Sequence, residues 1–370
     1  MKILAIETSC DDTGIAILEA KNKKFTVLSN IVSSQQIHIN YGGVFPIMAK
    51  REHQNNLVPT LIEALGAAKI LKNKKITLTD KQINTLKTIL EKESRLYEFT
   101  KEFLETYEKP KVDYIAVTHG PGLEPCLWVG VNFTKALSYF WDIPVIPVNH
   151  IEAHILVNFL ENPKIKFPAI SLIVSGGHTQ LILVKGVGKY TIIGETRDDA
   201  AGECFDKAAR ILGLAYPGGP IISKIASQIR ESSITLPRPM MHSKDYDFSF
   251  SGLKTSVLYK LRDTNPKIAK SEKFIQEMAF AIQDAICDVL IKKTLNAAKD
   301  YKAKTIILGG GVSANQELRK QFKVKSEIPV IFPEPKLSTD NGLMIAVAGY
   351  FNRAKKIGWQ RLSVHPNLRV

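Results

Sequence analysis

The sequence predicts an α/β protein built from two duplicated lobes, and two observations carry this prediction. Short apolar strands alternate with helical stretches along most of the 370 residues, which is typical of α/β architecture. Residues 2–18 form an apolar run, a polar turn and a second apolar run, and residues 170–185 repeat that order around a Gly-rich turn. Two such hairpins indicate an internal duplication, with two lobes around a central cleft. The alternative is two unrelated hairpins.

The chain is long enough for two lobes, each with its own core. We expect a first lobe at 1–150 and a second at 151–370, with the last helix returning to the first lobe. The clearest strands are expected at 114–118, 145–148, 170–174, 305–308 and 330–332. Helices are expected at 133–141, 150–160, 201–212, 271–301 and 316–322. Apolar residues recur at helical spacing in the longest of these, so one of its faces belongs to a core.

The stretch at about 68–111 predicts a helical insertion in the first lobe. Thr79 followed by Gln82 matches a capping box that opens a helix. Apolar residues then recur at near-helical spacing, with a break near Glu93, and Pro110 ends the run. This pattern predicts one long helix or a helical hairpin, whose apolar stripe packs on the lobe or on a partner.

Composition bounds the function classes. No leader pattern and no apolar run of about 18 residues occurs, which disfavours export and membrane spanning. The four cysteines, Cys10, Cys126, Cys204 and Cys287, form no CxxC pair, so a disulfide framework is disfavoured and a reducing cytoplasm fits. The net charge of +14 is compatible with a polyanionic partner such as nucleic acid. Since most of the basic residues are lysines, codon bias explains the charge equally well.

Several expected strands end in Gly-rich or polar turns. These turns read HGPGL at 119–123, SGGH at 175–178, and GGGVSAN at 309–315, while YPGGP at 216–220 joins two helices. Glycine lets a phosphate approach the backbone closely, and a helix N-terminus supplies N–H donors. Each loop alone is ordinary turn chemistry, but together they favour a nucleotide site. None matches the P-loop pattern, so a Walker-type ATPase is not supported.

The segment HIEAH at 150–154 places two histidines four residues apart. On a helix, His150 and His154 project from one face and can chelate one metal ion. The alternative is a pair of stacked surface histidines. A zincin protease needs its glutamate directly after the first histidine, and Glu152 stands one position late, which disfavours a metalloprotease. Asp340, between an expected strand and an apolar helix, is the best candidate for a third ligand.

Ten motifs in order now carry a resemblance to a known family. They are IETSCDDTGIAI, YGGVFP, HGPGL, HIEAH, VSGGHTQL, DDAAGECFDKAARILGL, YPGGP, FSFSGLKT, GGGVSAN and TDNGLMIA. The sequence resembles the universal family of tRNA threonylcarbamoyladenosine transferases, once labelled O-sialoglycoprotein endopeptidases. The resemblance covers nearly the whole chain except about 68–111. It implies the two-lobed fold of the actin, sugar kinase and heat-shock ATPase type.

The resemblance also implies a reaction. Threonylcarbamoyl-AMP would donate its threonylcarbamoyl group to N6 of adenosine 37 in tRNAs that read codons beginning with A, and AMP would leave. By resemblance, His150, His154 and Asp340 hold one divalent metal ion, iron(II) or zinc. Bacterial members work with an inactive paralogue of the same fold and a small P-loop ATPase, so we expect the isolated chain to turn over poorly. The implied setting is cytoplasmic, with no membrane.

The family's substrate positions fall on matching residues of this chain. The adenylate would be lined by Ile173, Val174, Ser175, Gly176 and Gly177. Further matches in the nucleotide site are Asp206, Gly219 and Asn315. The acidic turn carries Asp11 and Asp12, which are candidate catalytic groups, although the family more usually has Asp-Glu there. Three further departures are Pro125, Ser223 and Ser338, the last in place of a common cysteine.

The stretch 236–254 interleaves basic and aromatic residues, which suits an RNA backbone and a flipped base. Its candidate tRNA contacts are Arg238, Lys244 and Lys254, whereas Phe248 and Phe250 are expected to be core residues. Two other function classes stay open beside the transferase. One is an ATP-binding kinase or ATPase of the same fold, which has no need of the two histidines. The other is a non-catalytic scaffold, against which the presence of all three metal-ligand candidates argues.

Overall fold

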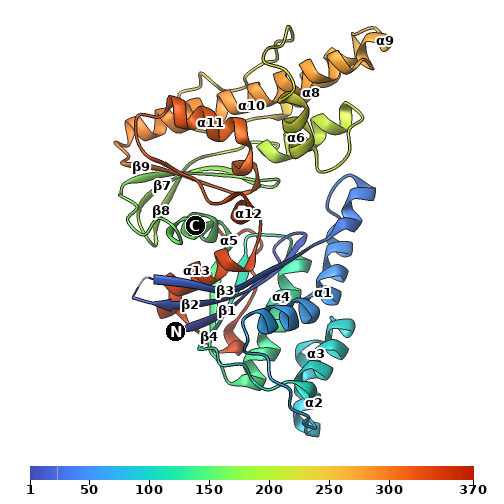
Figure 1. Ribbon diagram of the computed structural model, residues 1–370, viewed down its shortest axis with the longest axis vertical. Helices are drawn as coiled ribbons and strands as arrows, with labels where there is room; N and C mark the ends of the chain where they lie inside the picture. The colour runs from blue at the N-terminus through green and yellow to red at the C-terminus, as the bar shows by residue number, and fades with distance from the viewer. Residues whose placement is uncertain (23) are drawn as a thin grey trace. The chain divides into compact units, whose positions relative to one another are not determined.

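The computed structural model describes residues 1–22 and 24–370 (Figure 1). By their internal contacts these residues form two compact units. Unit 1 comprises residues 1–38, 44–163 and 340–370, and unit 2 comprises residues 39–43 and 164–339. Residues 151–163, expected in the second lobe, group with unit 1 because the helix that starts there packs against the helix that follows Asp340.

Unit 1 is built on a five-stranded mixed sheet in the order β3-β2-β1-β4-β5. Its strands are β1 (Lys2–Glu7), β2 (Asp12–Lys21), β3 (Lys24–Ser34), β4 (Tyr114–Gly120) and β5 (Val145–Asn149). The first three strands are antiparallel neighbours, and β4 and β5 run parallel to β1. The carboxyl ends of β1, β4 and β5 therefore meet at one edge of the sheet, where ligands of open α/β sheets bind.

Side-chain alternation along β1 divides the core of unit 1 between two layers. Leu4 and Ile6 are buried on the face covered by α1 (Pro46–Ala67) and α4 (Glu124–Trp141). Ile3 points to the other face, which α13 (Gly342–Asn352) covers; a Cβ added to Gly349 of this helix would lie 3.8 Å from the Ile3 side chain. The helix α5 (His150–Leu156) follows β5 directly and packs on α13. Short 3-10 turns complete the unit at Gln36–Tyr41 (η1, which ends in unit 2), Val157–Phe159 (η2), Arg353–Lys355 (η4) and Trp359–Arg361 (η5).

The insertion is a helical hairpin of α2 (Asp80–Ile89) and α3 (Ser94–Thr106). The predicted capping box is present, since the Thr79 hydroxyl accepts from the Gln82 backbone and the Gln82 side chain accepts from the Thr79 backbone. Leu86 and Phe103 are buried in the core of unit 1. The predicted helical insertion is confirmed; of the alternatives left open, the structure has the hairpin, and it packs on its own lobe.

Unit 2 repeats the strand plan of unit 1, with a sheet in the order β8-β7-β6-β9-β10. Its strands are β6 (Ala169–Val174), β7 (Thr179–Gly186), β8 (Lys189–Glu195), β9 (Thr305–Gly309) and β10 (Val330–Ile331). Again three antiparallel strands are followed by two parallel ones. This matching order confirms the predicted duplication.

Helices of unit 2 surround a second core. They are α6 (Ala201–Ile211), α7 (Gly218–Ala226), α8 (Ser251–Arg262), α9 (Pro266–Ala269), α10 (Glu272–Asp300), α11 (Gln316–Lys325) and α12 (Pro335–Ser338), with a 3-10 turn, η3, at Gly311–Ala314. The α10 residues Phe274, Met278 and Ile282 are buried in this core, as the helical spacing predicted. Phe248 and Phe250 are fully buried, which confirms that they are core residues.

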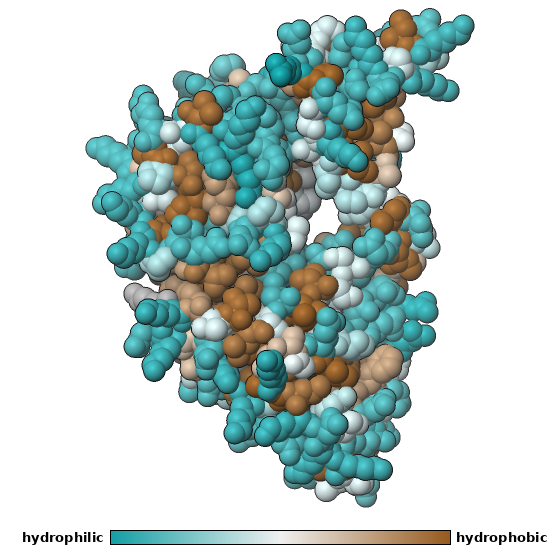
Figure 2. Space-filling model, in the orientation of Figure 1, coloured by the Kyte–Doolittle hydropathy of each residue, from teal (hydrophilic) through white to brown (hydrophobic). Residues whose placement is uncertain are grey.

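Most of the face of the molecule shown in Figure 2 is hydrophilic, with smaller hydrophobic areas between the polar side chains. Across residues 1–22 and 24–370, no helix combines the length and the apolar character needed to cross a membrane.

Candidate functional site

The two histidines of unit 1 lie at the carboxyl edge of its sheet. α5 starts at His150 because the side chain of Asn149 caps it, accepting hydrogen bonds from the backbone N–H groups of Ile151 at 2.8 Å and Glu152 at 3.0 Å. His150 and His154 share one face of this helix, with ring centroids 4.7 Å apart. The seven-residue helix therefore presents two imidazoles in one direction.

Asp340 brings a carboxylate to the same point. Its Oδ1 lies 3.5 Å from Nε2 of His150 and 3.2 Å from Nε2 of His154. One ligand atom from each of the three residues lies within 4.8 Å of the other two. The structure thus assembles the three side chains that the sequence singled out.

This donor set fits a divalent transition metal. Two imidazole nitrogens and one carboxylate oxygen are the ligands that zinc and iron(II) take in proteins. Both imidazoles are buried, and Nδ1 of His154 has no hydrogen-bond partner within the described parts of the chain. Burial lowers the pKa of His150, but the charges of Asp340 and Glu7 outweigh it and raise that pKa to about 9. The negative charges of Asp340 and Glu7 favour a proton on His150, and they would equally favour a metal cation in the place of that proton.

Three polar residues beside His150 escaped the sequence analysis. Glu7 ends β1 and is fully buried, and its Oε2 lies 3.3 Å from Nδ1 of His150. The hydroxyl of Ser9 lies 3.2 Å from the same nitrogen, and the Thr118 hydroxyl donates to Glu7. The sequence did contain a signal for two of them. Glu7 and Thr118 are polar residues near the carboxyl ends of two mainly apolar strands, and parallel strands that pair bring these ends to the same edge of the sheet.

The acidic turn after β1 is also in unit 1. Burial and the nearby charge of Asp340 raise the pKa of Asp11, and they raise that of Asp12 to about 7. His53 of α1 anchors this turn, since its Nε2 donates to the Cys10 carbonyl at 2.9 Å and its Nδ1 lies 2.8 Å from the Thr13 hydroxyl. Burial lowers the pKa of His53 to about 4, so the ring is neutral near pH 7.

The candidate adenylate loop of unit 2 joins β6 to β7. The backbone N–H of Ser175 donates to the carbonyl oxygen of His178 at 2.8 Å. The carbonyl oxygen of Ser175 accepts from the backbone N–H of Gly202 at 3.1 Å. The side chains of Ile173 and Val174 are fully buried, so only their backbone can reach a ligand. Gly176 and Gly177 are exposed, and a Cβ on either would meet no atom within 4 Å. This turn offers open backbone at the carboxyl end of a strand.

A second Gly-rich turn packs directly on the first strand end. Gly310, after β9, has φ +84°, and a Cβ there would lie 2.4 Å from the Val174 carbonyl oxygen. Only glycine fits this close approach. Asn315 in the same turn caps α11 by accepting from Leu318 N at 3.0 Å, and its Nδ2 donates to Gln283 at 2.9 Å. The turns after β6 and β9 therefore form one contiguous edge of the sheet in unit 2.

Asp206 and Gly219 lie where α6 and α7 meet. The Asp206 carboxylate accepts a hydrogen bond from Gly218 N at 2.7 Å, at the start of α7. Gly219, the next residue, would have only Phe205 within 4 Å of an added Cβ. Asp206 thus orders the N-terminal turn of α7, whatever else it contacts.

The three candidate RNA contacts differ in their surroundings. Arg238 forms ion pairs with Asp284 and with Asp288. The Nζ of Lys254 forms an ion pair with Oδ2 of Asp199 at 3.0 Å. Lys244 is exposed and takes part in none of the ion pairs among the described residues. Lys244 therefore presents the least compensated charge of the three.

Two family departures have a local explanation. Pro125 stands in the first turn of α4, where its missing N–H costs no hydrogen bond. The buried Ser338 hydroxyl accepts a hydrogen bond from Arg319 at 3.0 Å. Nothing in the structure explains Ser223, within α7.

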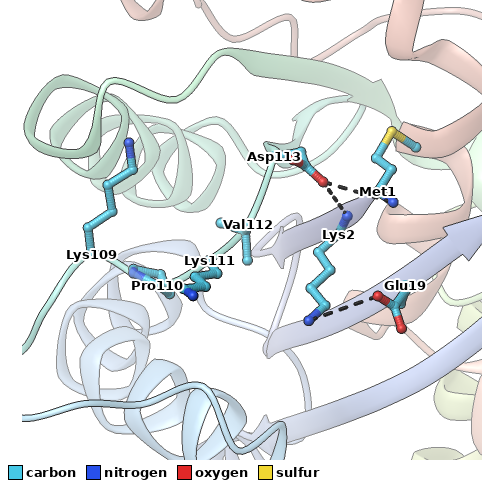
Figure 3. Close-up of a pocket in the computed structure, with 8 residues that line it drawn as sticks. All are labelled: Met1, Lys2, Glu19, Lys109, Pro110, Lys111, Val112 and Asp113. Carbon is cyan, nitrogen blue, oxygen red and sulfur yellow. Dashed lines mark hydrogen bonds and ion pairs between the residues drawn. The ribbon is translucent and has the colours of Figure 1, made fainter.

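A cavity of about 430 Å³ lies elsewhere in unit 1 (Figure 3). Figure 3 shows Asp113 turned toward the backbone nitrogens of Met1 and Lys2, and the Lys2 amine turned toward Glu19. Lys2 starts β1 and Glu7 ends it, which separates this cavity from His150 by roughly 17 Å of extended strand. The cavity is no part of the metal-ligand cluster.

Comparisons with known proteins agree with this description. The family model of tRNA N6-adenosine threonylcarbamoyltransferase matches residues 26–79 and 93–347, and its gap at 80–92 contains α2. The chain is 42% identical over 375 residues to the tRNA N6-adenosine threonylcarbamoyltransferase of Thermosipho africanus, covering 100% of both chains. It is 41% identical over 373 residues to that of Clostridioides difficile, covering 99% of this chain and 98% of the relative.

Two solved structures share the fold at 12% identity. Component A of (R)-2-hydroxyglutaryl-CoA dehydratase from Acidaminococcus fermentans has a TM-score of 0.52, covering 96% of this chain and 99% of that one. Full-length HypF in its phosphate- and nucleotide-bound form has a TM-score of 0.54, covering 95% of this chain and 46% of that one. They support the predicted two-lobed fold of the actin, sugar kinase and heat-shock ATPase type. The ordered motifs, the family model and the full-length relatives together show that the chain belongs to the family of tRNA N6-adenosine threonylcarbamoyltransferases.

Proposed function

We propose that the chain transfers the threonylcarbamoyl group from threonylcarbamoyl-AMP to N6 of adenosine 37 in tRNAs that read codons beginning with A. The adenine amine attacks the carbamoyl carbonyl carbon, the bond from that carbon to the AMP phosphate oxygen breaks, and AMP leaves with the electron pair while the amine loses a proton. The observation that carries the proposal is the cluster of His150, His154 and Asp340 within 4.8 Å, in a chain whose relatives over its full length bear this activity in their name.

In unit 2, the AMP moiety would bind at the strand-end loops. Exposed Gly176 and Gly177 allow a phosphate to approach the backbone without meeting a side chain. Asp206 would accept hydrogen bonds from ribose hydroxyls, and Gly219 and Asn315 would belong to the same nucleotide site. The poor nucleophilicity of an adenine amine makes this positioning a large part of the rate enhancement.

In unit 1, His150, His154 and Asp340 would hold one divalent metal ion, iron(II) or zinc. When bound, such an ion supplies a Lewis acid that polarises a carbonyl oxygen. Burial of the two imidazoles keeps competing water from these ligands. Asp11 and Asp12 are candidates to take the proton that the amine loses, since the raised pKa of Asp12, about 7, suits a base near neutral pH.

The substrates and partners follow from this reaction. The net charge of +14 suits a tRNA partner, and the enzyme would act on tRNA in the cytoplasm. By the same family reasoning, an inactive paralogue of this fold and a small P-loop ATPase would assist turnover. The kinase alternative leaves the three clustered metal-ligand side chains without a role.

A single-turnover assay tests the proposal. Purified protein in excess is mixed with threonylcarbamoyl-AMP that carries labelled threonine, and with a tRNA transcript that has A at position 37. The matched control is the same transcript with G at that position. We expect acid-precipitable label in the first transcript only. Equal labelling of both transcripts, or of neither while the adenylate binds, would contradict the proposal.

A further inference from the structure

Glu7 is a buried carboxylate that the proposed reaction does not use. It is the last residue of β1 and fully buried, where an acidic side chain is costly unless its oxygens are hydrogen-bonded. Its hydrogen-bond partners Ser9, Thr118 and His150 all belong to unit 1. We therefore expect the Glu7 carboxylate to have a specific role in this site, which offsets the cost of its burial.

Two partners fix the Glu7 carboxylate in place. Its Oε1 accepts a hydrogen bond from the backbone N–H of Ser9 at 2.6 Å, and its Oε2 accepts one from the hydroxyl of Thr118. Both donors belong to the carboxyl edge of the sheet, Ser9 just beyond β1 and Thr118 near the end of β4. The carboxylate therefore has a fixed orientation before any ligand binds.

The third neighbour of this carboxylate is His150. Nδ1 of His150 lies 3.3 Å from Oε2 of Glu7 and 3.2 Å from the hydroxyl of Ser9. An ionised carboxylate can only accept a hydrogen bond, so the proton between Glu7 and His150 resides on Nδ1. The lone pair of the neutral ring is then on Nε2, which is the nitrogen 3.5 Å from Asp340.

We propose that Glu7 is a positioning residue, which holds His150 with Nδ1 protonated and Nε2 turned toward Asp340 and thereby sets the affinity of this cluster for a divalent metal ion. A carboxylate that accepts from the far nitrogen of a ligating histidine fixes its ring orientation and raises its basicity. His154 offers the internal comparison, because its Nδ1 is buried with no hydrogen-bond partner within residues 1–22 and 24–370. Nδ1 of the second histidine is therefore not oriented by a hydrogen bond from any described residue, whereas Glu7 orients the first.

This inference rests on the metal centre of the proposed function, and a direct measurement of zinc affinity tests it. The variant is Glu7→Gln, which keeps the shape of the side chain but leaves one acceptor oxygen for three donors. The matched control is Glu152→Gln on α5: this carboxylate is also buried, but it accepts from Asn352 Nδ2 at 2.8 Å, and a glutamine oxygen can still do so. Zinc dissociation constants are measured by competition with a chromophoric chelator, and folding by circular dichroism.

We expect the zinc dissociation constant to rise 10- to 100-fold in Glu7→Gln and to stay within about twofold of wild type in Glu152→Gln. Equal affinity of Glu7→Gln and wild type would overturn the positioning role while leaving the metal centre intact. Wild-type affinity no higher than that of Asp340→Ala would instead show that the metal centre itself is wrong. These two failures are therefore distinguishable.

A second measurement needs no Glu7 variant and holds even where Glu7→Gln fails to fold. Nitrogen-15 NMR of wild-type protein labelled at histidine, with and without zinc, reports which ring nitrogen carries the proton. The His150 signals are assigned by their loss in His150→Gln. We expect a proton on Nδ1 and zinc on Nε2 in the loaded protein. A proton on Nε2 with zinc on Nδ1 would contradict the proposal.

Discussion

The carboxylate of Asp340 lies 3.2 Å from Nε2 of His154, although 186 positions separate the two residues in the sequence. Asn341, directly after Asp340, caps α13 by accepting from Met344 N at 3.1 Å. α13 in turn packs on α5, the helix that carries His154. The three candidate ligands are thus preorganised by helix packing within unit 1.

Removal of one ligand should abolish metal binding without unfolding the protein. We expect Asp340→Ala and His150→Ala, each purified without oxygen, to carry almost no iron or zinc by elemental analysis, because two remaining donors bind weakly. The core of unit 1 is made of apolar side chains elsewhere, so both variants should keep their circular dichroism spectrum. Glu63→Ala, at an exposed position of α1, is the matched control and should keep its metal. Full metal occupancy in either ligand variant would refute the assignment.

The buried His53 should make the stability of the protein depend on pH. Burial lowers its folded-state pKa to about 4 from an ordinary 6.5, so between these values the unfolded chain binds more protons than the folded one. The free energy of unfolding is therefore highest above pH 6.5 and falls as the pH drops toward 4, by about 3 kcal/mol from this group.

Urea unfolding at pH 7.5 and at pH 4.5 checks this prediction, with His53→Gln as the comparison. The glutamine cannot gain the proton, so the stability of the variant should fall less between the two pH values than that of wild type. Parallel losses in both proteins would show that His53 does not titrate as expected.

The adenylate loop can be tested with a pair of glycines. Gly177 and Gly186 both have open space at the Cβ position and no positive φ, so an alanine at either should leave the unfolding temperature unchanged. If a phosphate approaches the backbone of 175–177, the extra methyl group in Gly177→Ala should weaken AMP binding at least about tenfold. Isothermal titration calorimetry should show no such loss in Gly186→Ala, at the end of β7. Equal binding by both variants would remove this loop from the nucleotide site.

The insertion should contribute to stability but not to metal binding. Leu86 of α2 is fully buried in the core of unit 1, so Leu86→Ala should lower the free energy of unfolding by about 2–5 kcal/mol. Thr88→Ala, at an exposed position of the same helix, should change it little. Both folded variants should bind zinc as wild type does. A loss of zinc binding in folded Leu86→Ala would show that the insertion supports the metal site.

Sequence patterns predicted the parts of this structure that rest on local rules. Helical spacing identified the buried face of α10, and the Thr79–Gln82 capping box located the start of α2. The spacing of His150 and His154 identified their shared helix face. Glu7 could not be assigned a partner in this way, because its contacts with Thr118 and His150 span 111 and 143 positions and exist only once the parallel strands align.

The RNA candidates show the same limit. Arg238 and Lys254 have suitable chemistry in the sequence, but ion pairs with α10 and with Asp199 compensate their charges in the fold. A residue's type is visible in the sequence, whereas the charge left over after its neighbours are in place is not. This is why Lys244, which nothing in the sequence set apart, emerges as the least compensated of the three.

Nucleoside mass spectrometry of tRNA tests the central claim most directly. Cells depleted of their own enzyme of this family are complemented with this chain, or with its Asp340→Ala variant, and the threonylcarbamoyladenosine content of purified tRNA is measured. We expect the wild-type chain to restore the modified nucleoside and the variant to leave it depleted. Modification that stays absent with well-expressed wild-type chain and its helper proteins would contradict the assignment of this protein as a tRNA threonylcarbamoyltransferase.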